Sequence, residues 1–270
     1  MSCLDDIKND RLEVRLAKTP AEILAAQRLR YHVFFEEDGV TNTTRAGDTA
    51  IPTHGEKIDI DEFDAVCDHL IAIDLTTNRP AEQSIVGTYR LMRKEGRAKI
   101  GKWYSETEFN VEKFNTLEGE ILELGRSCVA KSHRNRLTMQ MMWNALAAYM
   151  FDYKIELMFG CGTFLGTNPD EYADALSYLY YNHVETGAMK ISAKGENARP
   201  MNLLPKDEID EAKAMAQMPT MIKGYIRIGA RISDSCWIDW GFNGFDVCII
   251  FETKNLRADY LKHYERMKNG

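Results

Sequence analysis

The alternation of apolar and polar side chains over residues 11–17 predicts a first strand. Thr19 is followed by Pro20 and, three positions on, by Glu22, a pattern typical of a helix N-terminus. We therefore expect a helix from Pro20 to about Glu37. Three further apolar or alternating runs predict strands. They are His69–Leu75, Ile85–Met92 and Ile121–Val129.

Helical spacing returns in the middle of the chain. Apolar residues recur every three or four positions from Met139 to Met150, which predicts an amphipathic helix. A buried strand is expected at Ile155–Cys161, and Asn168 and Pro169 mark the start of another helix that ends near His183. The remaining predicted elements are an insertion with short helical pieces, a basic amphipathic segment and a last strand, at 185–218, 220–231 and 246–252.

This order of elements predicts a mixed α/β fold, α+β-like, rather than the regular alternation of a doubly wound sheet. A central splayed, mostly antiparallel sheet flanked by helices fits it best. The length of 270 residues favours one domain with insertions over two domains. We expect a single domain over 1–270, with a core at about 11–184 and 220–252, an insertion at about 185–218 and a C-terminal helix at about 255–268.

Composition excludes several classes of protein. The chain has 34 basic and 41 acidic residues, a net charge of −7, so general nucleic-acid binding is not expected and any anionic partner must meet a local basic patch. The six cysteines are scattered without the spacing of a zinc site, which is typical of reduced thiols in a cytosolic protein. No apolar run approaches the roughly 20 residues that span a bilayer. We expect a cytoplasmic protein, with peripheral binding to the inner-membrane surface as an open alternative.

Charged residues inside the third predicted strand are the first candidates for chemistry. On a regular strand Glu123 and Arg126 would face opposite sides of the sheet. A β-bulge at Gly125 would bring both to one face and leave a backbone N–H unpaired. That pair of groups suits acyl transfer, because the carboxylate can accept an amine proton while the amide polarises a thioester carbonyl. The alternative is a partly exposed strand with an ordinary ion pair.

A basic turn joins this strand to the following helix, and it contains Lys131, His133, Arg134 and Arg136. Basic side chains beside the free N–H groups of a helix N-terminus favour an anion such as phosphate. A solvated basic turn is the alternative. Two further basic stretches, at 93–102 and 223–231, would suit an acidic carrier protein and lipid headgroups respectively, or are simply a solvated loop and a helix that lies on the core.

An acidic segment at residues 57–70 holds Asp61 and Asp64 on either side of Phe63. Its spacing does not match a calcium-binding loop. Two interpretations remain open: a solvated acidic surface, or a counter-charge for a cationic substrate.

Several segments of the chain resemble one bacterial enzyme family in order. They are RLRYHVFFEE, DEFDAVCDHLIAID, IVGTYRLMR, YSETEF, ELGRSCVAKSHRNR, LMFGCGTF, LSYLYYNH, MNLLP, IKGYIRIGA and FDVCII. Together they resemble the L-ornithine Nα-acyltransferases, often labelled hemolysin-like, which have the GNAT acyltransferase fold. The resemblance extends over roughly residues 11–252. It implies transfer of a fatty acyl group, typically 3-hydroxyacyl, from acyl carrier protein to the α-amine of L-ornithine. The product is lyso-ornithine lipid, the first intermediate of ornithine-lipid synthesis.

A more distant resemblance is to acyl-homoserine-lactone synthases, whose pattern is matched by Arg30, Phe34, Asp61, Asp64, Arg90, Glu123 and Arg126. The tryptophan that those synthases carry after the phenylalanine has no counterpart here. With the long C-terminal half, this difference argues against a signal synthase.

The general acetyltransferase pattern Arg-x-x-Gly-x-Gly/Ala is altered at the basic turn, because Leu137 and Met139 replace both small residues after Arg134. Glycine lets the backbone approach a pyrophosphate closely. We therefore expect the turn to bind a single phosphate, so that the donor is an acyl-carrier-protein thioester rather than acetyl-coenzyme A. No bound cofactor and no metal are expected.

The resemblance and the residues together predict direct acyl transfer without a covalent enzyme intermediate. Glu123 would accept the proton of the α-ammonium, directly or through water, and an N–H near Gly125 and Arg126 would stabilise the oxyanion. Arg30 and Arg90 would hold the ornithine carboxylate. The other predicted contacts are Phe34 beside Arg30, Asp61 and Asp64 as partners of the δ-ammonium or of the arginines, and His133, Arg134 and Arg136 around the pantetheine phosphate.

Two alternatives to this prediction remain. The same fold would acylate another acceptor, such as glycine, lysine or a homoserine-lactone precursor. A non-catalytic module that binds a carrier protein or a membrane belongs to a different class of protein.

Overall fold

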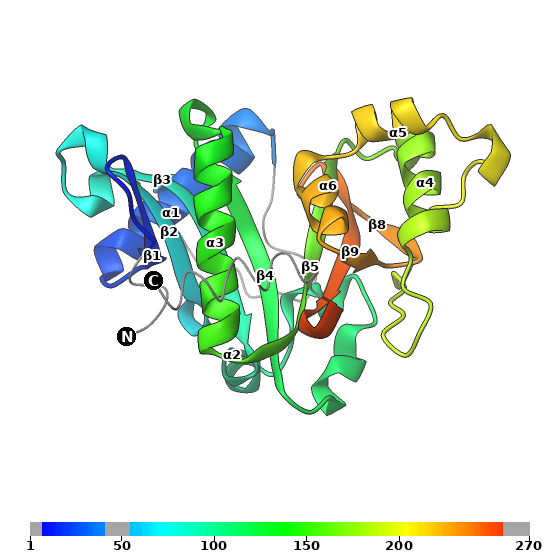
Figure 1. Ribbon diagram of the computed structural model, residues 1–270, viewed down its shortest axis with the longest axis horizontal. Helices are drawn as coiled ribbons and strands as arrows, with labels where there is room; N and C mark the ends of the chain where they lie inside the picture. Colours follow the sequence, from blue (N-terminus) through cyan, green and yellow to red (C-terminus); the bar gives the residue numbers. More distant parts are fainter. Residues whose placement is uncertain (1–6, 41–54, 256–270) are drawn as a thin grey trace.

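The computed structural model describes residues 7–40 and 55–255. Their strands form one mixed sheet with the strand order β1-β2-β3-β4-β5-β9-β8-β6, and β7 is also paired to β9 (Figure 1). The middle of the predicted loop at 39–57 and nearly all of the predicted helix at 255–268 lie outside the described residues. Among the described residues, no helix is long and apolar enough to cross a membrane.

The strands are β1 (Leu12–Leu16), β2 (Asp68–Asp74), β3 (Ile85–Arg93), β4 (Glu120–Val129), β5 (Ile155–Leu165), β6 (Ala198–Pro200), β7 (Arg231–Ile232), β8 (Ser235–Asp239) and β9 (Gly244–Glu252). All pairs are antiparallel except β4 with β5, which is parallel. The predicted splayed, mostly antiparallel sheet is confirmed.

Helices cover both faces of the sheet. They are α1 (Pro20–Tyr31), α2 (Lys94–Ile100), α3 (Arg136–Asp152), α4 (Ala173–His183), α5 (Glu211–Gln217) and α6 (Thr220–Arg227). On β2, Leu70 and Ala72 belong to the same apolar cluster as α3, whereas Ile71 and Ile73 pack with Ala26 of α1. Successive side chains of a strand point to opposite faces. Helix α3 therefore lies on one face of the sheet and α1 on the other, and Figure 1 shows α3 and α6 on the same side.

The parallel pair β4–β5 ends after a few residues. Pairing runs from Glu120 opposite Ile155 to Glu123 opposite Phe159 and then stops, although both strands continue. At the end of the pairing a Cβ on Gly160 would overlap the carbonyl oxygen of Leu124, so glycine is required where the two backbones pass. Beyond this point the sheet is split into two halves.

Several predicted boundaries change. The helical segment from Pro20 reaches Glu37 as expected, but after Tyr31 it continues as a π-helical segment, η2 (His32–Glu37). The wider turn changes the spacing of side chains along this part of the helix. Strand β5 extends to Leu165, beyond the predicted end at Cys161. Strands β6, inside the predicted insertion, and β8 are short, and the sequence pattern did not show them.

Candidate functional site

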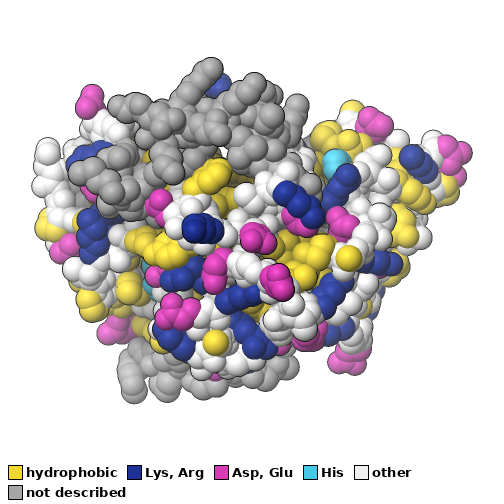
Figure 2. Space-filling model, turned by 60° about the horizontal axis from the view of Figure 1, so that its bottom comes forward, with side chains coloured by type: hydrophobic (Ala, Val, Ile, Leu, Met, Phe, Trp, Pro, Cys, Tyr) yellow, Lys and Arg dark blue, Asp and Glu magenta, His cyan; other side chains and the backbone are white. Residues whose placement is uncertain are grey.

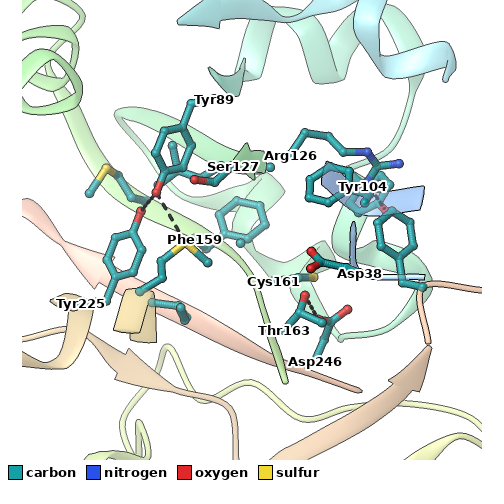
Figure 3. Close-up of a pocket in the computed structure, with 18 of the residues that line it drawn as sticks. Asp38, Tyr89, Tyr104, Arg126, Ser127, Phe159, Cys161, Thr163, Tyr225 and Asp246 are labelled. Carbon is teal, nitrogen blue, oxygen red and sulfur yellow. Dashed lines mark hydrogen bonds between the residues drawn. The ribbon is translucent and has the colours of Figure 1, made fainter. Parts of the chain in front are cut away.

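A cavity of about 290 Å³ occupies the gap between the separated parts of β4 and β5 (Figure 3). Its lining from these strands begins at Leu124 and Met158, next to the last paired residues. Because the cavity lies in a gap of the sheet, side chains from both faces of the sheet line it. The two faces differ in chemistry.

The face that carries α3 and α6 contributes mostly apolar side chains. Met158, Met221, Ile249 and Phe251 line the cavity from this side and belong to the large apolar cluster around α3. The polar groups here are hydroxyls. Tyr89 Oη and Tyr225 Oη lie 3.3 Å apart, and Ser127 lies on the same part of the cavity wall (Figure 3).

The opposite face contributes charge. Arg126 lines the cavity together with Tyr104, Asp38, Cys161, Thr163 and Asp246. Thr163 and Asp246 are paired across β5 and β9, and the threonine hydroxyl donates to the aspartate Oδ1 at 2.5 Å. Burial raises the pKa of the Asp38 carboxyl, which the nearby Arg134 only partly opposes. Figure 3 places the Thr163–Asp246 pair well away from the Tyr89–Tyr225 pair.

Strand β4 contains the bulge that the sequence predicted. Thr88 pairs with Cys128 and Arg90 pairs with Gly125, so two residues, Arg126 and Ser127, lie opposite the single residue Tyr89. The left-handed conformation falls on Arg126, with φ of 50°, rather than on Gly125. A non-glycine residue with positive φ is strained and is retained only where its surroundings hold it in place. The bulge brings Arg126 to the face of Glu123 and Arg90.

The surroundings of Arg126 are a buried network of three arginines and three aspartates. Arg126 donates to Asp59 at 3.0 Å, to Asp61 at 3.1 Å and to the hydroxyl of Tyr104 at 2.6 Å. Arg30 donates to Asp59 and, through two nitrogens, to Asp64. Arg90 donates to Asp61 and Asp64. These ion pairs connect α1, the acidic segment, β3 and β4.

Each charge in the network is compensated by an opposite charge. Burial favours the neutral carboxyl, but the guanidinium groups of Arg30 and Arg90 outweigh burial and hold the pKa of Asp64 well below its usual range. Arg90 and Arg126 lower the pKa of Asp61 in the same way. The acidic segment is therefore neither a solvated surface nor a wall of the cavity. Its aspartates organise the arginines, one of the two roles predicted for Asp61 and Asp64.

Arg30 and Arg90 were expected to hold a substrate carboxylate, and the structure does not place them against the cavity. The side chain of Arg30 is fully buried and ion-paired to two aspartates, and that of Arg90 is 3% exposed. Of the three network arginines, Arg126 lines the cavity. Phe34 also lines it, in edge contact with Phe242, which in turn stacks on the Arg126 guanidinium.

Glu123 lies behind the cavity wall. Its carboxylate accepts hydrogen bonds from the backbone N–H groups of Tyr104 and Ser105 at 2.8 and 2.7 Å, and from the Ser105 hydroxyl at 2.6 Å. Burial raises the pKa of Glu123, and these hydrogen bonds only partly offset it. Ser105 Oγ lies 3.4 Å from Cys161 Sγ, which faces the cavity. Glu123 is thus connected to the cavity through two intervening side chains.

A second group of acids near the cavity was not predicted. Cys161 donates to Glu108 at 3.2 Å, and ligand atoms of Glu108, Cys161 and Asp246 lie within 4.8 Å of one another, close enough to hold a cation. Glu108 and Asp246 are buried. These residues come from three segments far apart in the chain, so no local motif could have found them. The one sequence signal was an aspartate at the start of an otherwise apolar final strand.

The basic turn lies at the start of α3, as expected. Asn135 caps this helix by accepting from the N–H of Thr138 at 3.1 Å. Arg134 forms an ion pair with Glu37 at 2.6 Å, which joins the turn to η2, and His133 lies 3.1 Å from a carboxylate oxygen of Asp74. Arg136 is exposed at the first position of the helix. None of these three side chains is part of the cavity lining.

The basic stretch at 93–102 is interspersed with acids. Lys99 pairs with Glu95, and Lys102 pairs with Glu62. Figure 2 turns the α2 end of the molecule forward and shows basic and acidic side chains mixed across that face. Exposed pairs of this kind contribute little to stability. Their local neutrality favours a solvated surface over a docking site for an acidic carrier.

The described cysteines are all free thiols. Burial raises the pKa of Cys128 to about 12, which keeps this thiol protonated and inert. Cys128 is therefore unsuited to act as a nucleophile.

Comparison with known proteins decides the family. Residues 29–144 match the acetyltransferase (GNAT) domain. The L-ornithine Nα-acyltransferase of Rhizobium meliloti (strain 1021) is 40% identical over 255 residues, which cover 94% of this chain and 84% of that protein. The chain belongs to the L-ornithine Nα-acyltransferase family. A further member, from Rhodobacter capsulatus, is 34% identical, and the match covers 96% of this chain and 96% of that protein. The resemblance inferred from the sequence segments is confirmed.

Comparison with solved structures gives matches of low sequence identity. The AHL synthase LasI superimposes with a TM-score of 0.48 at 14% identity, covering 90% of this chain and 91% of that chain. FeeM, an N-acyl amino acid synthase from uncultured soil microbes, gives a TM-score of 0.43 at 10% identity, covering 91% and 93%. Family membership rests on the sequence relatives rather than on these structures.

The buried network predicts a large loss of stability when one arginine is removed. Arg30→Ala leaves Asp59 and Asp64 buried without their main counter-charge, so the free energy of unfolding should fall by about 3–5 kcal/mol. Arg28→Ala is the matched control, because Arg28 lies on the same helix and its ion pair with Glu56 is exposed. It should change stability by less than about 0.5 kcal/mol. Urea unfolding measures both, and equal effects would contradict the proposed importance of the network.

Stability should also depend on the protonation of His69. Burial lowers the pKa of this imidazole, whereas the unfolded chain has the usual value of about 6.5. The unfolded state therefore binds the proton more readily, and stability is lost as the pH falls from above about 6.5 towards the folded pKa. His69→Gln should lose less stability than the wild type between about pH 7.5 and pH 5.5 in urea unfolding. His183, whose pKa is also lowered, remains in both proteins. Equal losses would show that His69 does not titrate as described.

Proposed function

We propose that this protein transfers a fatty acyl group, typically 3-hydroxyacyl, from acyl carrier protein to the α-amine of L-ornithine, giving lyso-ornithine lipid. Alongside the sequence relatives, the observation that carries the proposal is the two-sided cavity between β4 and β5. An acyl chain needs an apolar wall, and a zwitterionic diamine needs charged groups of both signs. The cavity provides both, on opposite faces of the sheet.

The donor is an acyl thioester whose chain lies against the apolar face. Methionines such as Met158 and Met221 suit this role because their flexible side chains adapt to a long chain. The phosphate of the carrier's pantetheine binds at the start of α3, where Arg136 is exposed at the first helical position and Arg134 precedes it by two residues. His133 completes the proposed anion site. Leu137 and Met139, in place of small residues, favour this single phosphate over the pyrophosphate of coenzyme A.

The acceptor occupies the charged face. Arg126 replaces Arg30 and Arg90 as the proposed partner of the ornithine carboxylate, because it lines the cavity and they do not. Three of its five N–H groups are used by Asp59, Asp61 and Tyr104. The δ-ammonium lies against Asp246, which is held by Thr163, with Glu108 nearby. Their carboxylates carry the charge opposite to that of the δ-ammonium.

The reaction takes place beside the bulge. The free α-amine attacks the thioester carbonyl, the new C–N bond forms and the C–S bond breaks. The departing thiolate takes the proton that the attacking nitrogen loses. An amide of the bulge at Gly125–Arg126 stabilises the oxyanion, because the additional residue of a bulge lies outside the ladder of hydrogen bonds. Glu123 receives the ammonium proton through water, on the side where Ser105 and Cys161 lie between its carboxylate and the cavity.

An acceptor-dependent assay of thiol release tests the proposal. The purified protein is given acyl-carrier-protein thioester, or the same acyl group on coenzyme A, with ornithine, lysine, glycine or homoserine lactone. Thiol release that requires ornithine and the carrier protein is expected. Thiol release with a different amine would identify that amine as the acceptor instead of ornithine. Binding of the carrier protein without thiol release for any amine would indicate a non-catalytic module.

Glu123→Gln should lower the rate of acyl transfer by roughly 10²–10⁴-fold, as for the loss of an acid–base group. The substitution also places an amide NH₂ against the N–H donors of Tyr104 and Ser105. Turnover with saturating donor and acceptor is the measurement. Glu120→Gln, on the same strand, is the control and should retain wild-type turnover. Unchanged turnover in the Glu123 variant would remove this residue from the mechanism.

Asp246→Asn should reduce the preference for ornithine over L-norvaline, which has the same carbon chain without the terminal amine. A fall of about tenfold or more in the ratio of their kcat/KM values is expected, since a charged hydrogen bond is lost. The ratio does not depend on how much of the variant is folded. Asp174→Asn, a buried aspartate that pairs with Lys213, should leave it unchanged. An unaltered ratio in the Asp246 variant would place the δ-ammonium elsewhere.

A further inference from the structure

One carboxylate of the cavity wall, that of Asp38, has no role in the steps described so far. It lines the charged side of the cavity, and Figure 3 shows it among the side chains there without a hydrogen bond to any of them. Among the described residues it has no hydrogen-bond or ion-pair partner. By contrast, Asp246 accepts from Thr163 and Glu123 accepts from Ser105. The Asp38 carboxylate is therefore available to a substrate.

The end of η2 holds Asp38 beside the path of the donor. The backbone N–H of Asp38 donates to the carbonyl of Val33 at 3.0 Å, and the preceding Glu37 pairs with Arg134 at 2.6 Å. The proposed function, on which this inference rests, places the pantetheine phosphate at the basic turn and the thioester at the bulge. Asp38 is close to Arg134 of that turn and lines the cavity that holds the bulge.

The surroundings of Asp38 suit a group that gains and loses a proton within one turnover. Burial raises the pKa of its carboxyl, Arg134 opposes this only in part, and the negative charge of Glu37 adds to it. Such a carboxylate takes up a proton more readily than an exposed aspartate does. Glu123, behind the cavity wall, already serves the first proton, that of the ornithine ammonium. A second proton must leave the nitrogen after it has attacked.

We propose that Asp38 is a catalytic residue that carries this second proton from the attacking nitrogen to the departing sulfur. The carboxylate accepts the proton after the C–N bond has formed. The resulting carboxylic acid donates it to the sulfur as the C–S bond breaks. The products are the amide and the free thiol of the carrier, and the carboxylate is restored, so no other acid or base is consumed.

The test compares two donors whose leaving groups differ in acidity. Wild-type protein and Asp38→Asn receive the same acyl group on acyl carrier protein, either as the thioester or as a selenoester, in which selenium replaces the sulfur of the pantetheine arm. A selenol is more acidic than a thiol, so selenolate departs without a proton, whereas a thiolate is a poorer leaving group. Transfer to saturating ornithine is followed in a single turnover.

With the thioester, Asp38→Asn should react roughly 10²-fold or more slowly than the wild type, as for the loss of an acid–base group. With the selenoester, the two proteins should react at similar rates, because the leaving group needs no proton. The ratio of the two rates does not depend on how much of the variant is folded. Glu36→Gln is the matched control, because Glu36 lies on η2 but is exposed and pairs with Lys57. It should behave as the wild type with both donors.

An equal loss with both donors would show that Asp38 contributes only to structure or binding, and it would overturn the proposed proton transfer. Wild-type rates of Asp38→Asn with both donors would overturn it as well. In both cases the wild type would still acylate ornithine. Failure of the wild type to transfer the acyl group from either donor to ornithine would instead overturn the proposed function.

Discussion

The fold and the site depend on one interruption of the sheet, where β4 and β5 stop pairing after Glu123 and Phe159. Two local features accompany the separation. Gly160 allows the backbones to pass closely at the last contact, and the bulge at Arg126 and Ser127 then turns β4 away from a regular course. The gap that results is open to both faces of the sheet. Side chains that a continuous sheet would keep apart can therefore meet around one cavity.

The buried arginines and aspartates keep the charged side of this gap in place. Charges are removed from water only at high cost, and this cost is offset here because each guanidinium has carboxylate partners at hydrogen-bonding distance. The network also holds Arg126 in its strained conformation, with φ of 50°. Through the shared aspartates, Arg30 and Arg90 help to position Arg126, the arginine of this network that lines the cavity. This explains how residues of a functional pattern can be important without contacting a substrate.

The sequence predicted the sheet, the main helices and the bulge, because each depends on a local pattern. It also identified Arg90, Glu123 and Arg126 as exceptional, since charges are rare inside apolar strands. It could not show which charges neutralise one another. Asp59 and Arg126 are 67 residues apart and pair through the fold alone. The same limit applies to Glu108, Cys161 and Asp246, which three separate elements bring within 4.8 Å. The π-helical segment after Tyr31 was likewise not predicted, and Phe34 lines the cavity whereas Arg30 lies in the buried network.

The central claim is that the cavity holds the two ends of ornithine differently, with the α-amine at the bulge and the δ-ammonium at the acidic pair. The most direct measurement is tandem mass spectrometry of the product that the purified protein forms from acyl-carrier-protein thioester and L-ornithine. Fragmentation distinguishes an acyl group on the α-nitrogen from one on the δ-nitrogen. The account predicts Nα-acylornithine as the product. Acylation of the δ-nitrogen, or of both nitrogens equally, would contradict it.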